Sequence, residues 1–251
     1  MLDLVEKIRN GRPISYVFFD TGIEYSATKK HLDELEIEYG IKIIRAKAKI
    51  PVPAGCKKYG VPFLSKRVSM YIDRLQNHNF QWEDEPYETL VLKYPNCQSA
   101  LKWWCNAWGD NSRFNIERNK LLKEFMLQNP PSFSISDKCC NGAKKETAKQ
   151  IDKEFSCCIK FIGERRSEGG IRALRHHSCF DYNENDIVQS YRPLFFWTDQ
   201  DKQEYKDWYH IKYSDCYEIY GMSRTGCAGC PFGSKFEDEL SIISQYEPKL
   251  K

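Results

Sequence analysis

The sequence lacks the hallmarks of a membrane or exported protein. No stretch approaches the roughly 18 uninterrupted apolar residues that a membrane-spanning helix needs. Residues 1–7 carry charges where a secretory signal peptide has its apolar core. A formal net charge of only +3 gives no support for a protein that coats a polyanion. These absences predict a cytoplasmic protein without a membrane partner.

The composition is that of an ordinary globular protein, with 41% hydrophobic and 29% charged residues. A chain of 251 residues can bury one large core, or form one domain with a sizeable appendage. Eleven cysteines are present, and in a reducing compartment they are not expected to form disulfides. Metal binding or redox chemistry is therefore the leading explanation for the grouped cysteines.

The first 45 residues alternate between helical and strand patterns. The expected elements are a helix over 2–10, a strand over 14–19, a helix from a cap at Ser26 or Thr28 to about Tyr39 with Gly40 closing it, and a strand over 41–45. This order predicts an α/β fold with right-handed crossovers.

Polar residues follow the first predicted strand directly. Asp20, Thr21 and Gly22 stand at its carboxyl end, where open α/β sheets place their ligand contacts. The alternative is that Asp20 is a solvated turn residue.

The middle of the chain predicts a mostly helical insertion over residues 81–131, packed over the sheet. This insertion separates the N-terminal part of the α/β domain, residues 1–80, from the remainder of that domain, residues 132–251. Residues 55–62 predict a loop and 66–76 a helix. Within the insertion we expect a buried helix face over 101–108 and a helix over 115–127. The tryptophans of the insertion are expected to lie in its core. The alternative is that they are exposed and stack on nucleic-acid bases.

A Cys-x-x-Cys motif lies near the end of the sequence. Cys227 and Cys230 are separated by Ala-Gly in a turn that Gly226, Gly229 and Pro231 make tight, so both sulfurs can point at one centre. Alone, this motif fits a redox dithiol, half of a zinc site or half of an iron–sulfur site.

A pair of adjacent cysteines supplies the other half of a site. Cys139 and Cys140 stand at the start of a predicted helix with Asp137 as a plausible cap, where the helix dipole lowers thiol pKa values. Together with the Cys-x-x-Cys motif they form a complete set of four thiolates, which are soft ligands that favour zinc or iron–sulfur. Spacing does not separate these two metals.

The remaining cysteines are interpreted as structural. Cys157 and Cys158 precede an apolar run and are expected to alternate in and out of a strand. The other five lack metal-like partners in the sequence, and most are expected to be buried small apolar residues. They are Cys56, Cys97, Cys105, Cys179 and Cys216.

A cluster of arginines follows the apolar run 159–162. Arg165 and Arg166 are expected at the carboxyl end of a strand, where two guanidinium groups suit a sulfate or phosphate. The alternative is surface ion pairs with Glu164 and Glu168. Lys144 and Arg224 are further candidates for contact with an anion; for Lys144, plain solvation is equally compatible.

Several of these segments resemble the phosphoadenosine-phosphosulfate (PAPS) and adenylyl-sulfate reductase family. Residues 17–25, with Thr28 and the helix that follows, resemble the strand unit that lies beside the bound adenine nucleotide in that family. Cys-Cys followed by a distant Cys-x-x-Cys resembles the 4Fe-4S signature of bacterial adenylyl-sulfate reductases. The likeness covers most of residues 14–45 and 136–232, including Lys144, Lys145, 163–167, Arg172, 192–194, Trp197, Thr198 and 219–227.

The resemblance implies a fold and a set of site residues. The fold is a doubly wound parallel sheet of the adenine-nucleotide α-hydrolase (PP-loop) type, with its first strand missing and a helical insertion. The cofactor is a 4Fe-4S cluster on Cys139, Cys140, Cys227 and Cys230, with zinc as the alternative. The nucleotide or anion contacts are Asp20, Thr21, Gly22, Lys144, Arg165, Arg166, Arg172 and Arg224.

The resemblance implies oxidoreductase or sulfurtransferase chemistry on an adenylylated sulfate, with a thiol electron donor such as a thioredoxin. Family members carry a glycine-rich phosphate loop and a C-terminal catalytic cysteine; here no such loop precedes Asp20 and no cysteine follows Cys230. Whether the chain is an enzyme is therefore left open. The alternatives are ATP-dependent sulfur insertion into nucleic acid and a non-catalytic descendant with a structural zinc site.

Overall fold

The chain forms two compact units in the computed structural model. The structure describes residues 1–155, 159–169, 176–181, 189–233 and 235–250. The first unit comprises Met1–Asp20, Glu24–Lys47 and Glu146–Thr225, and the second comprises Thr21–Ile23, Ala48–Lys145 and Gly226–Lys251.

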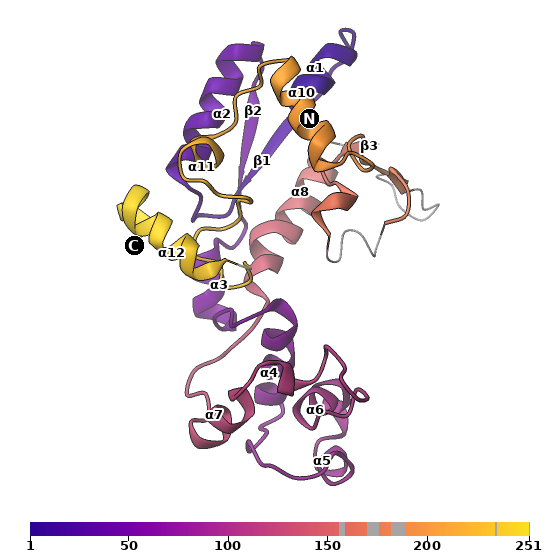
Figure 1. Cartoon of the computed structure of the whole chain (residues 1–251), viewed down its shortest axis with the longest axis vertical. Helices are drawn as coiled ribbons and strands as arrows, with labels where there is room; N and C mark the ends of the chain where they lie inside the picture. Colours follow the sequence, from indigo (N-terminus) through magenta and orange to yellow (C-terminus); the bar gives the residue numbers. More distant parts are fainter. Residues whose placement is uncertain (156–158, 170–175, 182–188, 234, 251) are drawn as a thin grey trace. The chain divides into compact units, whose positions relative to one another are not determined.

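The first unit contains every described strand of a sheet. Strands β1 (Tyr16–Asp20) and β2 (Ile43–Lys47) pair in parallel, with Tyr16 opposite Ile43 (Figure 1). Strand β5 (Gln189–Tyr191) pairs in parallel with β3 (Ile159–Phe161) and antiparallel with β4 (Phe180–Asp181). The helices of this unit are α1 (Leu2–Ile8), α2 (Ser26–Tyr39), α8 (Glu146–Glu154), α10 (Asp199–Trp208) and α11 (Asp215–Glu218). The predicted α/β fold with parallel strands is confirmed.

The predicted start of α2 is wrong in detail, whereas its end is confirmed. The cap position is Tyr25, which makes no side-chain capping bond, and Ser26 is the first helical residue. Thr28 lies inside the helix, where its hydroxyl contacts the sulfur of Cys216 at 3.6 Å. Gly40 closes the helix in the left-handed conformation, at φ +61°.

One carboxylate joins three helices of the first unit. Asp3 on α1 accepts hydrogen bonds from Tyr39 at 3.0 Å and from Tyr205 on α10 at 2.6 Å. The ammonium group of Lys7 adds an ion pair at 2.9 Å. These bonds lower the pKa of Asp3 although its burial alone would raise it. The charged form of Asp3 therefore fastens α1 to α2 and α10.

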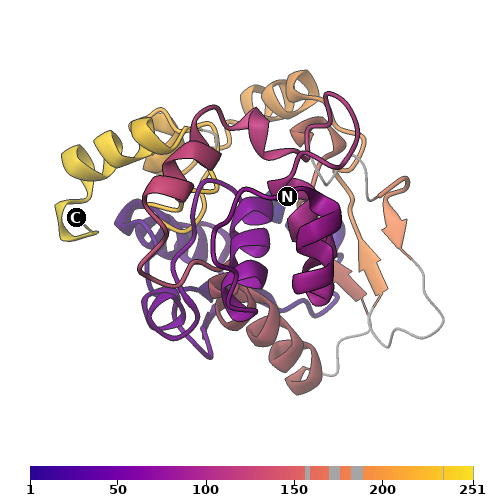
Figure 2. The same ribbon diagram turned by 90° about the horizontal axis from the view of Figure 1, so that it is seen from below.

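The second unit is helical in its described part. Its α-helices are α3 (Val52–Tyr59), α4 (Lys66–Asn77), α5 (Tyr87–Lys93), α6 (Gln98–Trp104), α7 (Leu122–Gln128) and α12 (Phe236–Tyr246). Figure 2 shows α4 beside α6, and these helices share a hydrophobic core. Trp103 and Trp104 are almost fully buried in it, and the indole N–H of Trp104 donates to the carbonyl of Glu83 at 2.9 Å. The predicted core role is confirmed for Trp103 and Trp104. The predicted buried helix face over 101–108 is wrong at its end, because α6 stops at Trp104 and Trp108 is 37% exposed.

The prediction of a loop over residues 55–62 is wrong, because α3 covers most of that stretch. Pro51 is the cap residue and Pro53 lies in the first turn, where a proline costs no hydrogen bond. Lys57 and Lys58 lie in the last turn, where the helix dipole favours positive charge. Gly60 ends the helix.

The prediction of one continuous helix over 115–127 is also wrong. A short 3-10 helix, η2 (Ile116–Arg118), is followed by a break before α7. Leu121 takes a left-handed conformation, at φ +64°, and its side chain is 77% exposed. The apolar pattern that suggested one helix therefore includes a residue that is not part of the buried face.

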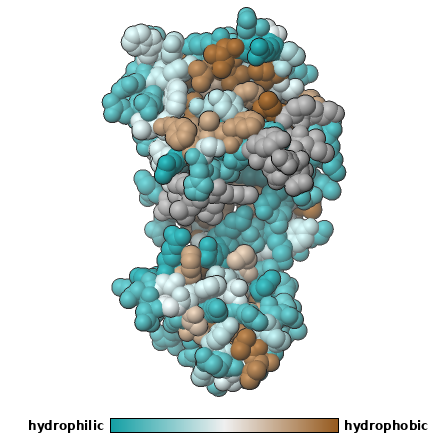
Figure 3. Space-filling model, turned by 90° about the vertical axis from the view of Figure 1, so that its right-hand side faces the viewer, coloured by the Kyte–Doolittle hydropathy of each residue, from teal (hydrophilic) through white to brown (hydrophobic). Residues whose placement is uncertain are grey.

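In Figure 3, the surface of the α4–α7 region that faces the viewer is mostly hydrophilic. A hydrophobic patch, shown in brown, lies near the lower end of this region. Within the described residues, no helix combines the length and apolar character needed to cross a bilayer.

Candidate functional site

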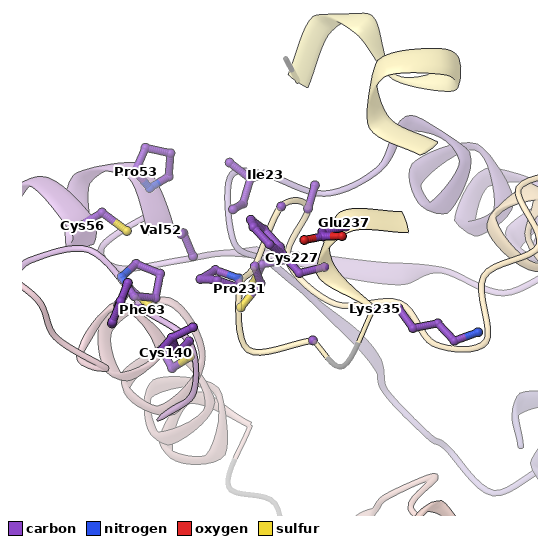
Figure 4. A pocket seen from close by; sticks show the side chains of 18 of the residues that line it. Ile23, Val52, Pro53, Cys56, Phe63, Cys140, Cys227, Pro231, Lys235 and Glu237 are labelled. Atoms are coloured by element: carbon purple, nitrogen blue, oxygen red, sulfur yellow. The ribbon is translucent and has the colours of Figure 1, made fainter. Parts of the chain in front are cut away.

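Five cysteines line one cavity of about 940 Å³ in the second unit. They come from three segments: Cys56 from α3, Cys139 and Cys140 from the adjacent pair, and Cys227 and Cys230 from the Cys-x-x-Cys turn. Figure 4 shows Cys56, Cys140 and Cys227 around this space, with Lys235 and Glu237 beyond the turn. The structure thus brings together the two halves of the predicted four-thiol site.

The Thr21–Ile23 segment anchors two of the walls. The carbonyl of Thr21 accepts from the amide of Val52 at 2.8 Å, which fixes the start of α3. The carbonyl of Ile23 accepts from the amide of Ala228 at 3.0 Å, which fixes the Cys-x-x-Cys turn. Gly22 has φ +91°, and a Cβ there would lie 2.9 Å from the Cβ of Pro51. These residues therefore have a structural function at the cavity, independent of the predicted nucleotide contact.

The adjacent cysteines stand where a helix begins, as predicted. They precede the π-helical turn η3 (Asn141–Lys145), which leads into α8. Such turns are rare and occur frequently at functional sites. A Cβ on Gly142 would lie 2.8 Å from the Cβ of Ile50, so a glycine is needed for this close packing.

The Cys-x-x-Cys segment is a hydrogen-bonded turn. The amide of Cys230 donates to the carbonyl of Cys227 at 3.2 Å, and the amide of Gly233 donates to the carbonyl of Cys230 at 3.2 Å. Gly229 occupies the left-handed region at φ +66°. The predicted tight turn is confirmed.

The two adjacent thiols differ in their affinity for a proton. A hydrogen bond from Cys139, together with the charges of Lys66 and Lys144, lowers the pKa of Cys140 to about 6, although burial acts to raise it. The same hydrogen bond, together with burial, raises the pKa of Cys139. The predicted lowering of thiol pKa therefore holds for Cys140 and is wrong for Cys139, because neighbouring thiols cannot both ionise easily.

Cys56 is a site residue that the sequence analysis missed. It was interpreted as a cysteine without metal-like partners, yet its side chain is hydrogen-bonded to that of Cys139. It is half-buried and packs with Cys139, Cys140, Cys227 and Cys230 around a small apolar cluster. No local spacing marks this residue; the one signal is the preceding Gly55, which permits a close approach of α3 to the cysteine pair.

The other cysteines that the structure describes divide into two groups. Cys97 and Cys216 are fully buried, which confirms their interpretation as small apolar residues. Cys105 and Cys179 are half-buried. Cys157 and Cys158 lie outside the described residues.

Most of the predicted anion contacts belong to the first unit. Asp20 ends β1 and lies 3.8 Å from the ammonium group of Lys29. Arg165 is buried, and its guanidinium donates to the carbonyl of Thr198 at 2.9 Å and to Asp199 at 2.7 Å. This guanidinium is thus engaged in structural contacts.

The exposed members of the predicted set are Arg166 and Arg224 in the first unit and Lys144 in the second. Lys144 acts on the cavity through its effect on Cys140. Arg172 lies outside the described residues. Anion binding by these residues stays a prediction.

The donor set at the cavity suits a soft metal, since five thiols line it, beside the carboxylates of Glu237 and Asp238. In the described part of the chain, no three cysteine, histidine or acidic side chains converge closely enough to hold an ion as they stand. The thiols would therefore need to move inward around a metal.

Comparisons with known proteins identify one family. Residues 111–232, which contain all four predicted ligands, match the model of the phosphoadenosine phosphosulfate reductase domain. An uncharacterized protein of Methanocaldococcus jannaschii is 36% identical over 114 residues, which are 45% of this chain and 22% of that protein. The chain thus matches about a fifth of this relative's length.

A solved structure with a similar chain course is the PAPS reductase of Candida auris in its phosphate complex. It is 15% identical, with a TM-score of 0.47, over 90% of this chain and 73% of that one. The match shows that residues 111–232 of the chain are similar to the phosphoadenosine phosphosulfate reductase domain.

Proposed function

We propose that the cavity of the second unit is a metal centre in which Cys139, Cys140, Cys227 and Cys230 hold one iron–sulfur cluster. The observation that carries this proposal is that two cysteine segments far apart in the sequence line the same cavity. Thiolates are the usual ligands of such clusters. A bound cluster would supply electron transfer or sulfur chemistry to a neighbouring substrate.

The chain's own residues prepare the site for a metal. Cys140, with its pKa lowered to about 6, is largely a thiolate at neutral pH and is the first ligand available. Burial raises the pKa of Cys230, and the hydrogen bond to Cys140 raises that of Cys139, so both release a proton when they bind. Metal uptake should therefore weaken as the pH falls.

We further propose that the first unit is of the adenine-nucleotide α-hydrolase type, with a doubly wound sheet, and that it binds an adenine nucleotide or a sulfonucleotide. Asp20 at the end of β1 and Arg166 just after β3 stand at carboxyl ends of parallel strands, which is where such folds bind ligands. The match of residues 111–232 to the phosphoadenosine phosphosulfate reductase domain supports this substrate class.

The metal proposal is tested by anaerobic purification followed by metal analysis and a visible spectrum. We expect a brown protein with iron and sulfide bound, and loss of the iron in Cys139→Ala and Cys227→Ala. Cys97→Ala is the control, because Cys97 is buried in the helical core away from the cavity lining. A colourless protein with stoichiometric zinc would support the structural zinc alternative instead, and Cys139→Ala with unchanged metal would contradict the ligand assignment.

The nucleotide proposal is tested by calorimetric titration with AMP and with adenosine 5′-phosphosulfate. Arg166→Ala should weaken binding about 10- to 100-fold, the effect of losing a charge-assisted hydrogen bond of about 1.5–3 kcal/mol. Arg12→Ala is the control, since Arg12 is also exposed in the same unit and its backbone carbonyl and amide are hydrogen-bonded to Arg9. Absence of binding by the parent protein would contradict this proposal without affecting the metal proposal.

A further inference from the structure

The cavity contains one thiol more than a four-cysteine centre uses. Cys56 lines the same cavity as the predicted ligands, yet it lies outside residues 111–232, the part of the chain that the family model matches. It belongs to α3, which the Thr21–Ile23 segment holds in place through Val52. The function of the Cys56 thiol is therefore inferred from the residues that it contacts.

The contact of Cys56 is specific. Its side chain is hydrogen-bonded to Cys139, the most buried thiol of the cavity, which is 3% exposed. The approach of α3 is close at this point, since a Cβ on Gly55 would lie 3.3 Å from the Cα of Cys139. Backbone packing thus fixes the position of Cys56 beside one predicted ligand.

We infer that in the metal-loaded protein Cys56 is not a ligand but a positioning residue, whose S–H group donates a hydrogen bond to the metal-bound thiolate of Cys139. This inference rests on the proposed metal centre. Once Cys139 has given up its proton to bind the metal, it can only accept, and Cys56 is the neighbouring donor. The bond orients the Cys139 sulfur and spreads part of its negative charge.

Such outer hydrogen bonds have measurable effects. Loss of a partner that orients a metal ligand typically costs about 10- to 100-fold in metal affinity. Hydrogen bonds to ligand sulfurs also help to set the reduction potentials of iron–sulfur centres. Because the bond stabilises the more negative, reduced state, its removal should make the potential more negative.

The experiment compares Cys56→Ala, which removes the donor, with Cys56→Ser, which keeps a donor of similar size. Cys105→Ala is the control, because Cys105 is a half-buried cysteine of the same unit that does not line the cavity. Each metal-free full-length protein is titrated anaerobically with Co²⁺. Affinity is measured by competition with a chelator, and the sulfur ligands are counted from the intensity of the thiolate-to-cobalt absorption.

We expect Cys56→Ala to bind Co²⁺ about 10- to 100-fold more weakly with unchanged absorption intensity. Cys56→Ser should stay close to the parent and the control. For the iron-loaded proteins, the reduction potential should become more negative in Cys56→Ala only.

Three results would overturn the inference. Equal affinity of Cys56→Ala and the parent would show that the bond has no influence. Equal weakening of Co²⁺ binding in Cys56→Ala and Cys56→Ser would show that the sulfur itself is required. Loss of about a quarter of the thiolate-to-cobalt absorption in Cys56→Ala would make Cys56 a ligand of a four-sulfur site. If the parent gave no thiolate-to-cobalt absorption at all, the metal centre itself would be refuted, and this inference with it.

Discussion

The contact between the end of α3 and the segment before the cysteine pair gives a sharp test of how the cavity is held together. Gly60 has φ +107° and ψ 159°, a region that is essentially restricted to glycine. The amide of Val61 donates to the carbonyl of Ser134 at 2.9 Å, and the amide of Ser136 donates to the carbonyl of Val61 at 2.9 Å. Substitution of Gly60 by alanine should disturb this junction.

The expected magnitude follows from two costs. A side chain in this backbone conformation costs about 1–3 kcal/mol. The added Cβ would also lie 2.6 Å from the carbonyl oxygen of Ser134, and such overpacking costs a further 1–3 kcal/mol, roughly. We therefore expect Gly60→Ala to lower the free energy of unfolding by about 2–6 kcal/mol.

Urea unfolding monitored by tryptophan fluorescence measures this loss, because Trp103 and Trp104 report on the same unit. Gly109→Ala is the matched control: Gly109 also has a positive φ, at +94°, but a Cβ there would meet nothing within 4 Å. That control should lose only about 1–2 kcal/mol. Equal losses in the two variants would refute the claim that the Ser134 contact is tight.

Two further predictions concern the thiol pair and the helical core. In the metal-free protein, the rate of Cys140 alkylation by iodoacetamide should rise with pH around its pKa of about 6, because the thiolate is the reactive form. Lys144→Ala should raise that pKa and slow the reaction at pH 6, whereas Lys145→Ala should not; equal rates in the two variants would contradict the role of Lys144. Trp104→Ala should cost about 3–5 kcal/mol in urea unfolding, whereas Trp208→Ala, at a side chain that is 80% exposed, should change stability by about 0.5 kcal/mol or less. A small loss for Trp104→Ala would contradict its place in the core.

The features that could be predicted from the sequence are those with a local cause. The short apolar run that ends in Asp20 predicted strand β1, because the run alone is typical of a parallel strand; in the structure the five residues of β1 are half-buried. The sequence also predicted that Cys139–Cys140 and Cys227–Cys230 share one site, and they line the same cavity; their binding of a metal stays a prediction. Buried Trp103 and Trp104 followed from helical periodicity.

The features that were missed depend on tertiary packing. Cys56 carries no spacing signal, and it reaches the cavity because α3 packs closely at Gly55. Leu121 fits a helical pattern, but its left-handed backbone takes it out of that pattern. The pKa values of Cys139 and Cys140 shift in opposite directions because of their mutual hydrogen bond. A helix-dipole argument misses this difference, since it predicts the same lowering of the pKa for both thiols.

The central claim is that the two cysteine segments converge on one metal. X-ray absorption at the metal edge of the anaerobically purified protein tests this most directly, since it reports the atoms in the first coordination shell. The proposed four-cysteine centre predicts a shell of sulfur alone, at about 2.3 Å as is typical of thiolate ligands. A shell containing nitrogen or oxygen, or the absence of a stoichiometric metal, would contradict the claim.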